Sequence, residues 1–174
     1  MNLLSLLRAW MILALALVLF GCGDSSPKLP LAGFKVEFGK HNIPAEMAAG
    51  EAVLADVTIK NASSRTWPSK PDSRGRNAVN LAYHWLDRKR QVVVLDGVRT
   101  PLPRDLNPDE SVTLRATIRA PEKAGEYLLH VTLVQEGVAW FSDRDGGHLS
   151  VPVSIAAGSA PLPQGSNYGG RKTR

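Results

Sequence analysis

The stretch VNLAYHWL at residues 79–86 places large apolar side chains at every second position: Val79, Leu81, Tyr83 and Trp85. The residues between them are smaller or polar. A period of two is that of a β-strand, because successive side chains of a strand point to opposite faces of the sheet. The stretch therefore predicts a strand with one face in a hydrophobic core.

The same period recurs across residues 32–156, in the segments 34–38, 53–59, 112–118, 127–133 and 149–155. Segments rich in Pro, Gly, Asn, Asp and Ser separate these stripes, as expected of turns. Residues 87–90 read DRKR and predict a hairpin tip that joins the Trp85 strand to residues 92–95. No segment has a sustained helical period. The pattern predicts an all-β fold, an antiparallel β-sandwich of seven to nine strands.

Two details favour an immunoglobulin-like sandwich. Trp85 lies on an apolar stripe in mid-chain, as the core Trp of that fold does. Residues 124–127 read AGEY, which resembles a tyrosine corner, in which a Tyr that opens a strand bonds back to nearby backbone. We expect Trp85 and Tyr127 to be core residues rather than ligand contacts.

The N-terminus has the pattern of a secretory signal peptide: Arg8 precedes an uncharged apolar run from Ala9 to Phe20. A run of 12 residues is too short to span a bilayer. Residues 19–22, LFGC, resemble the bacterial lipobox, which implies lipidation of Cys22 and anchoring in the membrane. Gly23 follows where Asp often signals inner-membrane retention, so the resemblance implies the outer membrane, facing the periplasm. The alternative is a secreted protein in which Cys22 is incidental.

These features predict four segments: a signal peptide (1–21), a lipidated Cys with a tether (22–31), the sandwich (32–156) and a disordered basic tail (157–174). Removing the signal peptide leaves 153 residues, enough for one domain with a core. Cys22 is the only cysteine, so no internal disulfide stabilises the fold. Because Arg8 is the only charge in the signal peptide, the remainder carries a net charge of +4. This mild charge and the predicted compartment do not indicate nucleic acid as a partner.

A denser signal lies in residues 61–141. It comprises NASSRTWP (61–68), LAYHWLD (81–87), DGVRTPLP (96–103) and VQEGVAWF (134–141). Together these motifs resemble a β-sandwich module found with bacterial glycosyltransferases and methyltransferases of surface-polysaccharide pathways. They are also similar to the glycan-binding sandwich of O-antigen export transporters. The chain departs from this pattern at Lys89-Arg90, where a Gly closes the hairpin, at Leu95, where Trp is common, and at Asp109, where Gly is common.

The candidate ligand-binding residues form an aromatic and polar set: Trp67, Asp96, Arg99, Glu136, Trp140 and Phe141. Flat aromatic faces stack on sugar rings, while carboxylates and guanidinium groups bind hydroxyls. Trp140 and Phe141 are adjacent, so in a strand they point to opposite sides. Alternatively, an Arg99–Glu136 or Arg99–Asp96 pair holds loop 96–104 against the sandwich.

Three histidines fall on the polar phase of their strands: His84, His130 and His148. If Trp85 faces Leu129 across two strands, His84 and His130 lie side by side. Three imidazoles on one face are a possible Zn²⁺ or Cu²⁺ site, but we expect packed or solvated neutral histidines and no metal.

No motif for a nucleophile, a phosphate loop or a metalloprotease is present, so neither an enzyme nor a cofactor is expected. The sequence predicts an envelope lipoprotein with a non-catalytic module that binds a cell-surface or envelope glycan. The alternative is a protein-interaction or assembly factor of the envelope that uses a sheet edge or loops.

Overall fold

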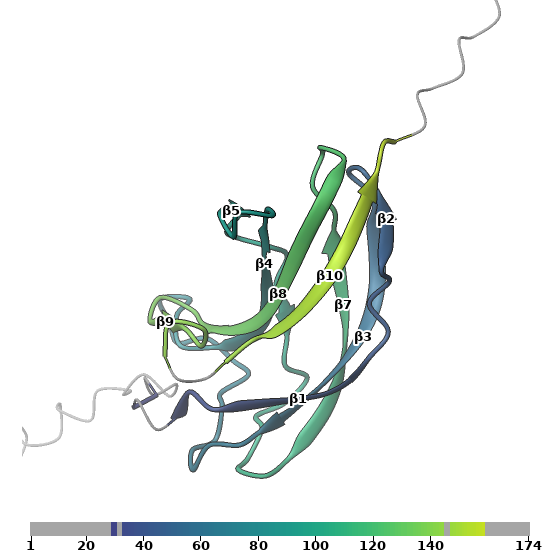
Figure 1. Cartoon of the computed structure of the whole chain (residues 1–174). Helices are drawn as coiled ribbons and strands as arrows, with labels where there is room; N and C mark the ends of the chain where they lie inside the picture. The colour runs from purple at the N-terminus through teal and green to yellow at the C-terminus, as the bar shows by residue number, and fades with distance from the viewer. Residues whose placement is uncertain (1–28, 31–32, 145–146, 159–174) are drawn as a thin grey trace, which may run out of the picture.

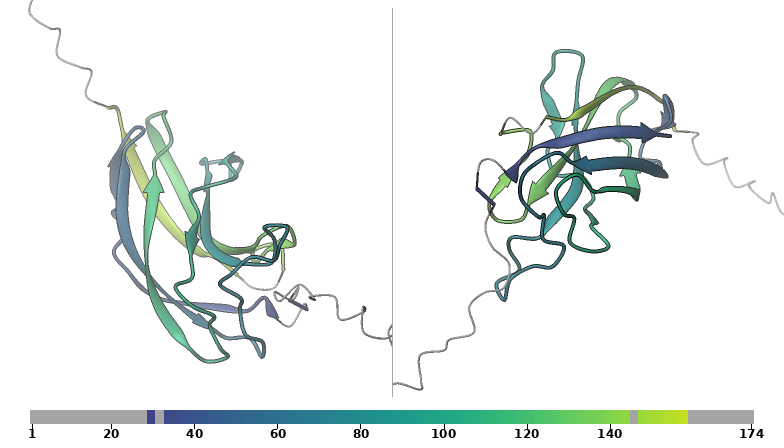
Figure 2. Two further views of the ribbon diagram at one scale, coloured as in Figure 1. Left: turned by 180° about the vertical axis from the view of Figure 1, so that it is seen from behind. Right: turned by 90° about the horizontal axis from the view of Figure 1, so that it is seen from below.

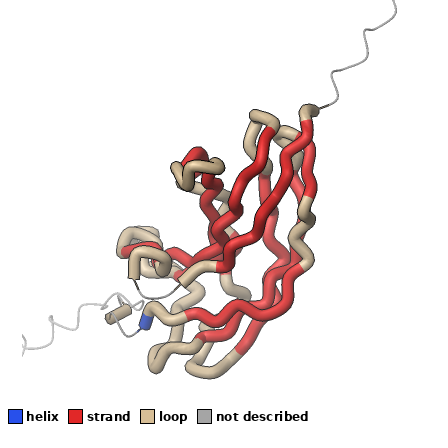
Figure 3. The backbone as a smooth tube through the Cα atoms, in the orientation of Figure 1, coloured by secondary structure: helices blue, strands red, loops and turns tan. Residues whose placement is uncertain are grey.

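The computed structural model describes residues 29–30, 33–144 and 147–158. The predicted signal peptide, Cys22 and nearly all of the predicted tail lie outside these residues. The described part contains ten strands and no α-helix, and Figure 3 shows it as strands and loops apart from one short helical piece. None of its segments is therefore a helix of the length and apolarity that a membrane span requires.

The strands form two sheets packed face to face, as Figures 1 and 2 show. One sheet has the order β1-β3-β7, with bounds Val36–His41, Ala52–Asn61 and Ser111–Arg119. The other has the order β2-β10-β8-β4-β5, with bounds Glu46–Ala48, Leu149–Ala156, Gly125–Gln135, Val79–Leu86 and Val92–Val94. Two short strands extend this second sheet: β6 (Thr100–Pro101) pairs with β4, and β9 (Ala139–Trp140) pairs with β8. The predicted immunoglobulin-like β-sandwich is confirmed, although the described residues form ten strands where seven to nine were predicted.

One pairing differs from the antiparallel prediction: β2 pairs with β10 in parallel. The chain leaves the first sheet after β1 and joins the second at β2. Just before β2, Ala45 O accepts a hydrogen bond from Ser154 N of β10 at 2.8 Å. Pro44 stands in this crossing, where its missing N–H interrupts no ladder. Strand period alone carries no information on the direction of the partner, which is why the sequence did not predict this pairing.

The core lies between the sheets and contains the apolar stripe of β4. Trp85 is fully buried, and its Nε1 donates to Arg119 O at 2.8 Å. Arg119 N in turn donates to Tyr83 Oη at 2.9 Å, so β4 and β7 are linked across the sandwich. Tyr127 Oη donates to Lys123 O at 2.9 Å, which is the bond of a tyrosine corner.

The outer face of β4 does not face water as the alternating pattern predicts. Ala82 and His84 are both buried, because two segments fold over them. Gly97 N donates to Tyr83 O at 3.0 Å, which brings the segment after β5 back onto β4. Trp140 of β9 packs against His84. This covered face is where the candidate site forms.

The folded domain also reaches further back than predicted. Leu29, assigned to the tether from sequence, is only 6% exposed and belongs to the core. Its backbone N–H donates to Oε1 of the fully buried Gln135 at 3.0 Å. The prediction that Leu29 belongs to the tether is therefore wrong.

Two positions that depart from the resembled pattern are conformationally special. Arg90 and Asp109, which stand where glycine is common, have φ angles of 61° and 63°. Positive φ is strained for residues with a Cβ. The backbone at both turns therefore has a conformation that suits glycine, although Arg and Asp stand there.

Candidate functional site

Trp140 is the centre of the candidate site. It lies on β9, opposite Val134 of β8, after a tight turn in which Gly137 has a φ of 67°. Its ring meets the imidazole of His84 edge to face, with 4.4 Å between centroids. The guanidinium carbon of Arg99 lies 4.7 Å from the centroid of the Trp140 ring, a cation–π distance. Trp140 remains partly exposed.

Arg99 connects the loop after β5 to the sandwich. Its Nε donates to Glu136 Oε1 at 2.9 Å, and its Nη1 donates to Gly97 O at 3.0 Å and pairs with Asp96. Asn80 Nδ2 donates to the same Glu136 oxygen at 2.9 Å. Partial burial alone would lower the pKa of Arg99, but the bonds to Glu136 and Asp96 outweigh it and raise that pKa. Both ion pairs proposed from sequence form, and they hold loop 96–104 in place.

These side chains line an open depression of about 490 Å³, here called the Trp140 hollow. Its wall includes Leu95, Asp96, Arg99, Trp140, Asp143 and Arg144. The size is that of small-molecule sites in proteins. An aromatic ring beside carboxylates and guanidinium groups provides both an apolar face and hydrogen-bonding groups to a ligand.

Two of the six predicted contacts do not reach the surface. Trp67 and Phe141 are both 0% exposed, with 5.2 Å between their ring centroids. Trp67 Nε1 donates to Gly33 O at 2.7 Å, and Phe141 also packs on Phe34. The prediction that Trp67 and Phe141 contact a ligand is wrong: both are core residues. The predicted alternation of Trp140 and Phe141 is confirmed.

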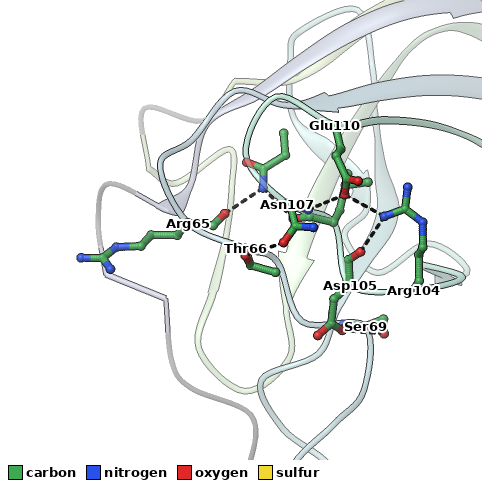
Figure 4. A network of polar contacts seen from close by, with 9 residues as sticks. Arg65, Thr66, Ser69, Arg104, Asp105, Asn107 and Glu110 are labelled. Atoms are coloured by element: carbon green, nitrogen blue, oxygen red, sulfur yellow. Dashed lines mark hydrogen bonds and ion pairs between the residues drawn. The ribbon is translucent and has the colours of Figure 1, made fainter.

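Trp67 is buried because two loops are crosslinked beside it (Figure 4). Its backbone forms an isolated bridge with Leu106. Around it, Thr66 Oγ1 bonds Asn107 Oδ1 at 2.9 Å and Ser69 N donates to Asp105 Oδ1 at 2.8 Å. Together with an Arg104–Glu110 ion pair of 2.7 Å, these bonds close one end of the sandwich.

The histidines lie together as the register predicted, since His84 pairs with His130 and Trp85 with Leu129. The rings of His130 and His148 are stacked, with 4.0 Å between centroids. Burial lowers the pKa of His130 to about 4, and the nearby His148, His84 and Arg90 act in the same direction. No group of three or more His, Cys, Asp or Glu side chains in residues 29–30, 33–144 and 147–158 is arranged to hold a metal ion.

A second depression was not predicted from the sequence. It has a volume of about 570 Å³ and lies between the β4–β5 hairpin and the turn before β8. Its wall includes Arg88, Lys89, Val93, Lys123 and Tyr127, and it is here called the cationic hollow. Residues 88–89 and 123 are far apart in the sequence, and the pairing of Leu86 with Leu128 brings their segments together. In the sequence, the only signal of this hollow is the run DRKR at residues 87–90, which predicts a hairpin tip and not a binding site.

The sequence matches no known family model and no curated protein. Several solved structures are similar to the chain. The CARDB domain of a Pyrococcus furiosus protein is 16% identical over 70% of this chain and 92% of that one, with a TM-score of 0.39. A β-glucosidase from Listeria innocua is 15% identical over 71% of this chain, with a TM-score of 0.43, and the match spans 16% of the glucosidase. The ASH/PapD-like domain of human CEP192 is 13% identical over 83% and 99% of the two chains, with a TM-score of 0.31. Identities and scores this low transfer no activity to this chain.

Proposed function

We propose that this chain is an outer-membrane lipoprotein, anchored through Cys22, whose sandwich is a non-catalytic module that binds an envelope glycan. The Trp140 hollow is the proposed glycan site. The observation that carries this proposal is the partly exposed Trp140 ring beside Arg99, Asp96 and Asp143. An aromatic face and charged groups at one depression match the apolar and hydroxyl-bearing sides of a sugar.

The anchoring part of the proposal rests on the sequence of residues 8–23. More than one acyl chain at Cys22 would hold the protein stably, since each buried CH₂ contributes about 0.8 kcal/mol. The test is mass spectrometry of the N-terminal peptide from membrane fractions. A diacylglyceryl-modified Cys22 supports the anchor, whereas an unmodified peptide that starts elsewhere contradicts it.

Trp140 also provides a selective optical probe of the hollow. Trp67 and Trp85 are 0% exposed, whereas Trp140 is partly exposed. A soluble quencher such as acrylamide should therefore reach Trp140 and not the two buried rings. A bound glycan should protect Trp140 from the quencher.

The experiment is a titration of the full chain, as cells process it, with oligosaccharides from lipopolysaccharide and capsule. We expect saturable protection from acrylamide, and a loss of affinity of about tenfold or more in Trp140→Ala. Trp140→Phe keeps an aromatic face and should bind more tightly than the Ala variant. Equal affinity of wild type and Trp140→Ala would contradict the site.

A second candidate function, strand addition to an envelope protein, is favoured by one observation on β7. This nine-residue strand pairs only with β3 among the strands of the described part of the chain. The N–H and C=O of Arg119 point away from β3, because they bond Tyr83 and Trp85. In an antiparallel pair, every second residue of a strand directs these groups to the same edge, so the N–H groups of Arg115 and Thr117 also point away from β3. Edges of this kind accept strands from partners.

The variant Arg115→Pro tests this alternative, because proline is tolerated on an edge strand but removes the outward donor. In-cell crosslinks to an envelope protein that disappear in Arg115→Pro and persist in Trp140→Ala would favour strand addition over glycan binding. The reverse pattern, or an absence of crosslinked protein, would favour the glycan.

A further inference from the structure

We propose that the cationic hollow is a binding site for an anionic glycan, one that carries carboxylate or phosphate groups. This inference goes beyond the proposed function, because it concerns a second depression that shares no lining residue with the Trp140 hollow.

The first argument is charge. Three cationic side chains line the hollow: Arg88, Lys89 and Lys123. Among the described residues the structure gives none of them an ion-pair partner within 4 Å. These three cations face one space of about 570 Å³. Because none of them is in an ion pair, their electrostatic field can attract a ligand of opposite charge.

The two carboxylates of the same hollow are used internally. Asp87 Oδ1 accepts the backbone N–H groups of Lys89 and Gln91, at 2.8 and 2.9 Å. Glu126 Oε1 accepts the hydroxyl of Ser154 at 2.9 Å. The hollow is thus lined by three cationic and two anionic side chains, a net charge of +1, and both acids are already hydrogen-bonded to uncharged groups.

The second argument is that the backbone beneath the cations is held in place before any ligand arrives. On one side, Arg90 N donates to Asp87 O and Asp87 N to Gln91 O, both at 2.9 Å, which closes the hairpin. On the other side, the carbonyl of Lys123 accepts the hydroxyl of Tyr127 at 2.9 Å. Because this backbone is already ordered, a ligand that binds restricts the conformations of the long side chains alone, and the entropy cost of binding is lower.

The third argument separates a glycan from other anions. Tyr127 and the 48% exposed Val93 give the hollow an apolar wall, on which a sugar ring can pack. An acidic peptide would bind best by adding a strand to β5, but β5 has only three residues and its pairing with β4 is irregular. Short, irregular edges next to charged residues resist strand addition.

Lipid headgroups of the anchoring membrane are also disfavoured. The chain enters the sandwich at Leu29, which bonds Gln135, and Gln135 pairs with Val79 at the start of β4. The hollow lies beyond the other end of β4, eight residues away, or about 25 Å. Figure 1 shows β5 and β9 well separated along this sheet. This orientation rests on the proposed anchor at Cys22, whereas the charge argument does not.

The test is calorimetric titration of the full chain, as cells process it, with oligogalacturonate, a carboxylated glycan. A neutral maltooligosaccharide of the same length is the ligand control. The variant is the triple substitution Arg88→Ala, Lys89→Ala and Lys123→Ala. Its matched control removes the same charge from exposed positions elsewhere, as Lys35→Ala, Lys40→Ala and Arg65→Ala.

We expect binding of oligogalacturonate and none of the neutral sugar. The triple variant should lose on the order of 100-fold in affinity, since each of the three close charge contacts is worth about 1 kcal/mol in water and every 1.4 kcal/mol is tenfold. The control should lose less than about threefold, and higher salt should weaken wild-type binding. The single variant Lys123→Glu, which leaves the hairpin untouched, should lose more than Lys123→Ala.

Equal losses in the triple variant and its control would overturn the proposal, because only net charge would then matter. Equally tight binding of an oligoglutamate peptide would overturn the assignment to a glycan. Trp140→Ala should leave oligogalacturonate binding within about twofold. If Trp140→Ala abolishes that binding and the triple variant does not, this inference fails while the proposed function stands.

Discussion

Replacing the buried Gln135 by leucine should destabilise the domain strongly. The Gln135 side chain is 0% exposed and joins three segments. Its Oε1 accepts the N–H of Leu29 at 3.0 Å, and its Nε2 donates to Asn77 O at 2.9 Å. Leucine has a similar size but bonds neither group, so one N–H and one C=O lose their buried partner.

Each unsatisfied buried group costs about 1–3 kcal/mol, and the added apolar contact of leucine returns part of this. We therefore expect Gln135→Leu to lower the free energy of unfolding by about 3 kcal/mol. With an m-value of about 2 kcal/mol/M, the urea midpoint falls by about 1.5 M. The assay is urea unfolding followed by the fluorescence of the buried tryptophans.

Gln91→Leu is the matched control, because Gln91 is exposed and its side chain makes no bond that the structure records. It should change the unfolding free energy by less than about 0.5 kcal/mol. In Gln135→Leu we also expect faster amide exchange at Leu29, since its acceptor is gone. A loss below about 1 kcal/mol would refute the reasoning that Gln135 fixes the N-terminal segment to the sandwich.

Three further predictions follow from single positions. Arg90→Gly should raise the unfolding free energy by about 0.5 kcal/mol, because glycine adopts the positive φ of this position without strain. Lys89→Gly in the same hairpin is the control and should lower the unfolding free energy, and urea titration measures both changes. Tyr127→Phe removes the hydrogen bond to Lys123 O and should lower the free energy of unfolding, measured by thermal denaturation, by about 1 kcal/mol. An unchanged free energy would show that this bond does not stabilise the fold. The pKa of His130 is about 4 when folded and about 6.5 when unfolded, so its stability contribution is full above pH 6.5 and is lost toward pH 4. His130→Gln should flatten this acid dependence in urea titrations across pH 7 to 4, while an unchanged slope would assign it to other groups.

The strand period identified the fold class because a sheet with one buried face imposes it on the sequence. Trp85 was correctly expected in the core, since its position in the stripe fixes which way it points, whereas Tyr127 packs against the core but is only partly buried. The neighbouring positions of His84 and His130 also followed, because the pairing of Trp85 with Leu129 determines the register of every other pair on those strands. Period is a local property that a sequence carries directly, whereas this register joins distant strands and was inferred from the immunoglobulin comparison.

Trp67 and Leu29 were assigned wrongly for one common reason. Each lies in a segment that reads as loop or tether, and its burial depends on a partner far along the chain: Leu106 for Trp67 and Gln135 for Leu29. Likewise, the cationic hollow exists only because β4 and β8 pair, which sets Arg88 near Lys123.

The sequence by itself determined seven of the ten strands, their inward stripes and the turns between them, since these follow from the alternation of side chains and the conformations of turn residues. Only the tertiary structure decided which aromatic rings reach solvent: Trp140 remains partly exposed while Trp67 and Phe141 are enclosed. Exposure depends on which distant loops cover a residue, and that is a property of the packed chain rather than of any segment. The surface on which a ligand can bind is therefore fixed by long-range contacts, although its residues are scattered through local motifs.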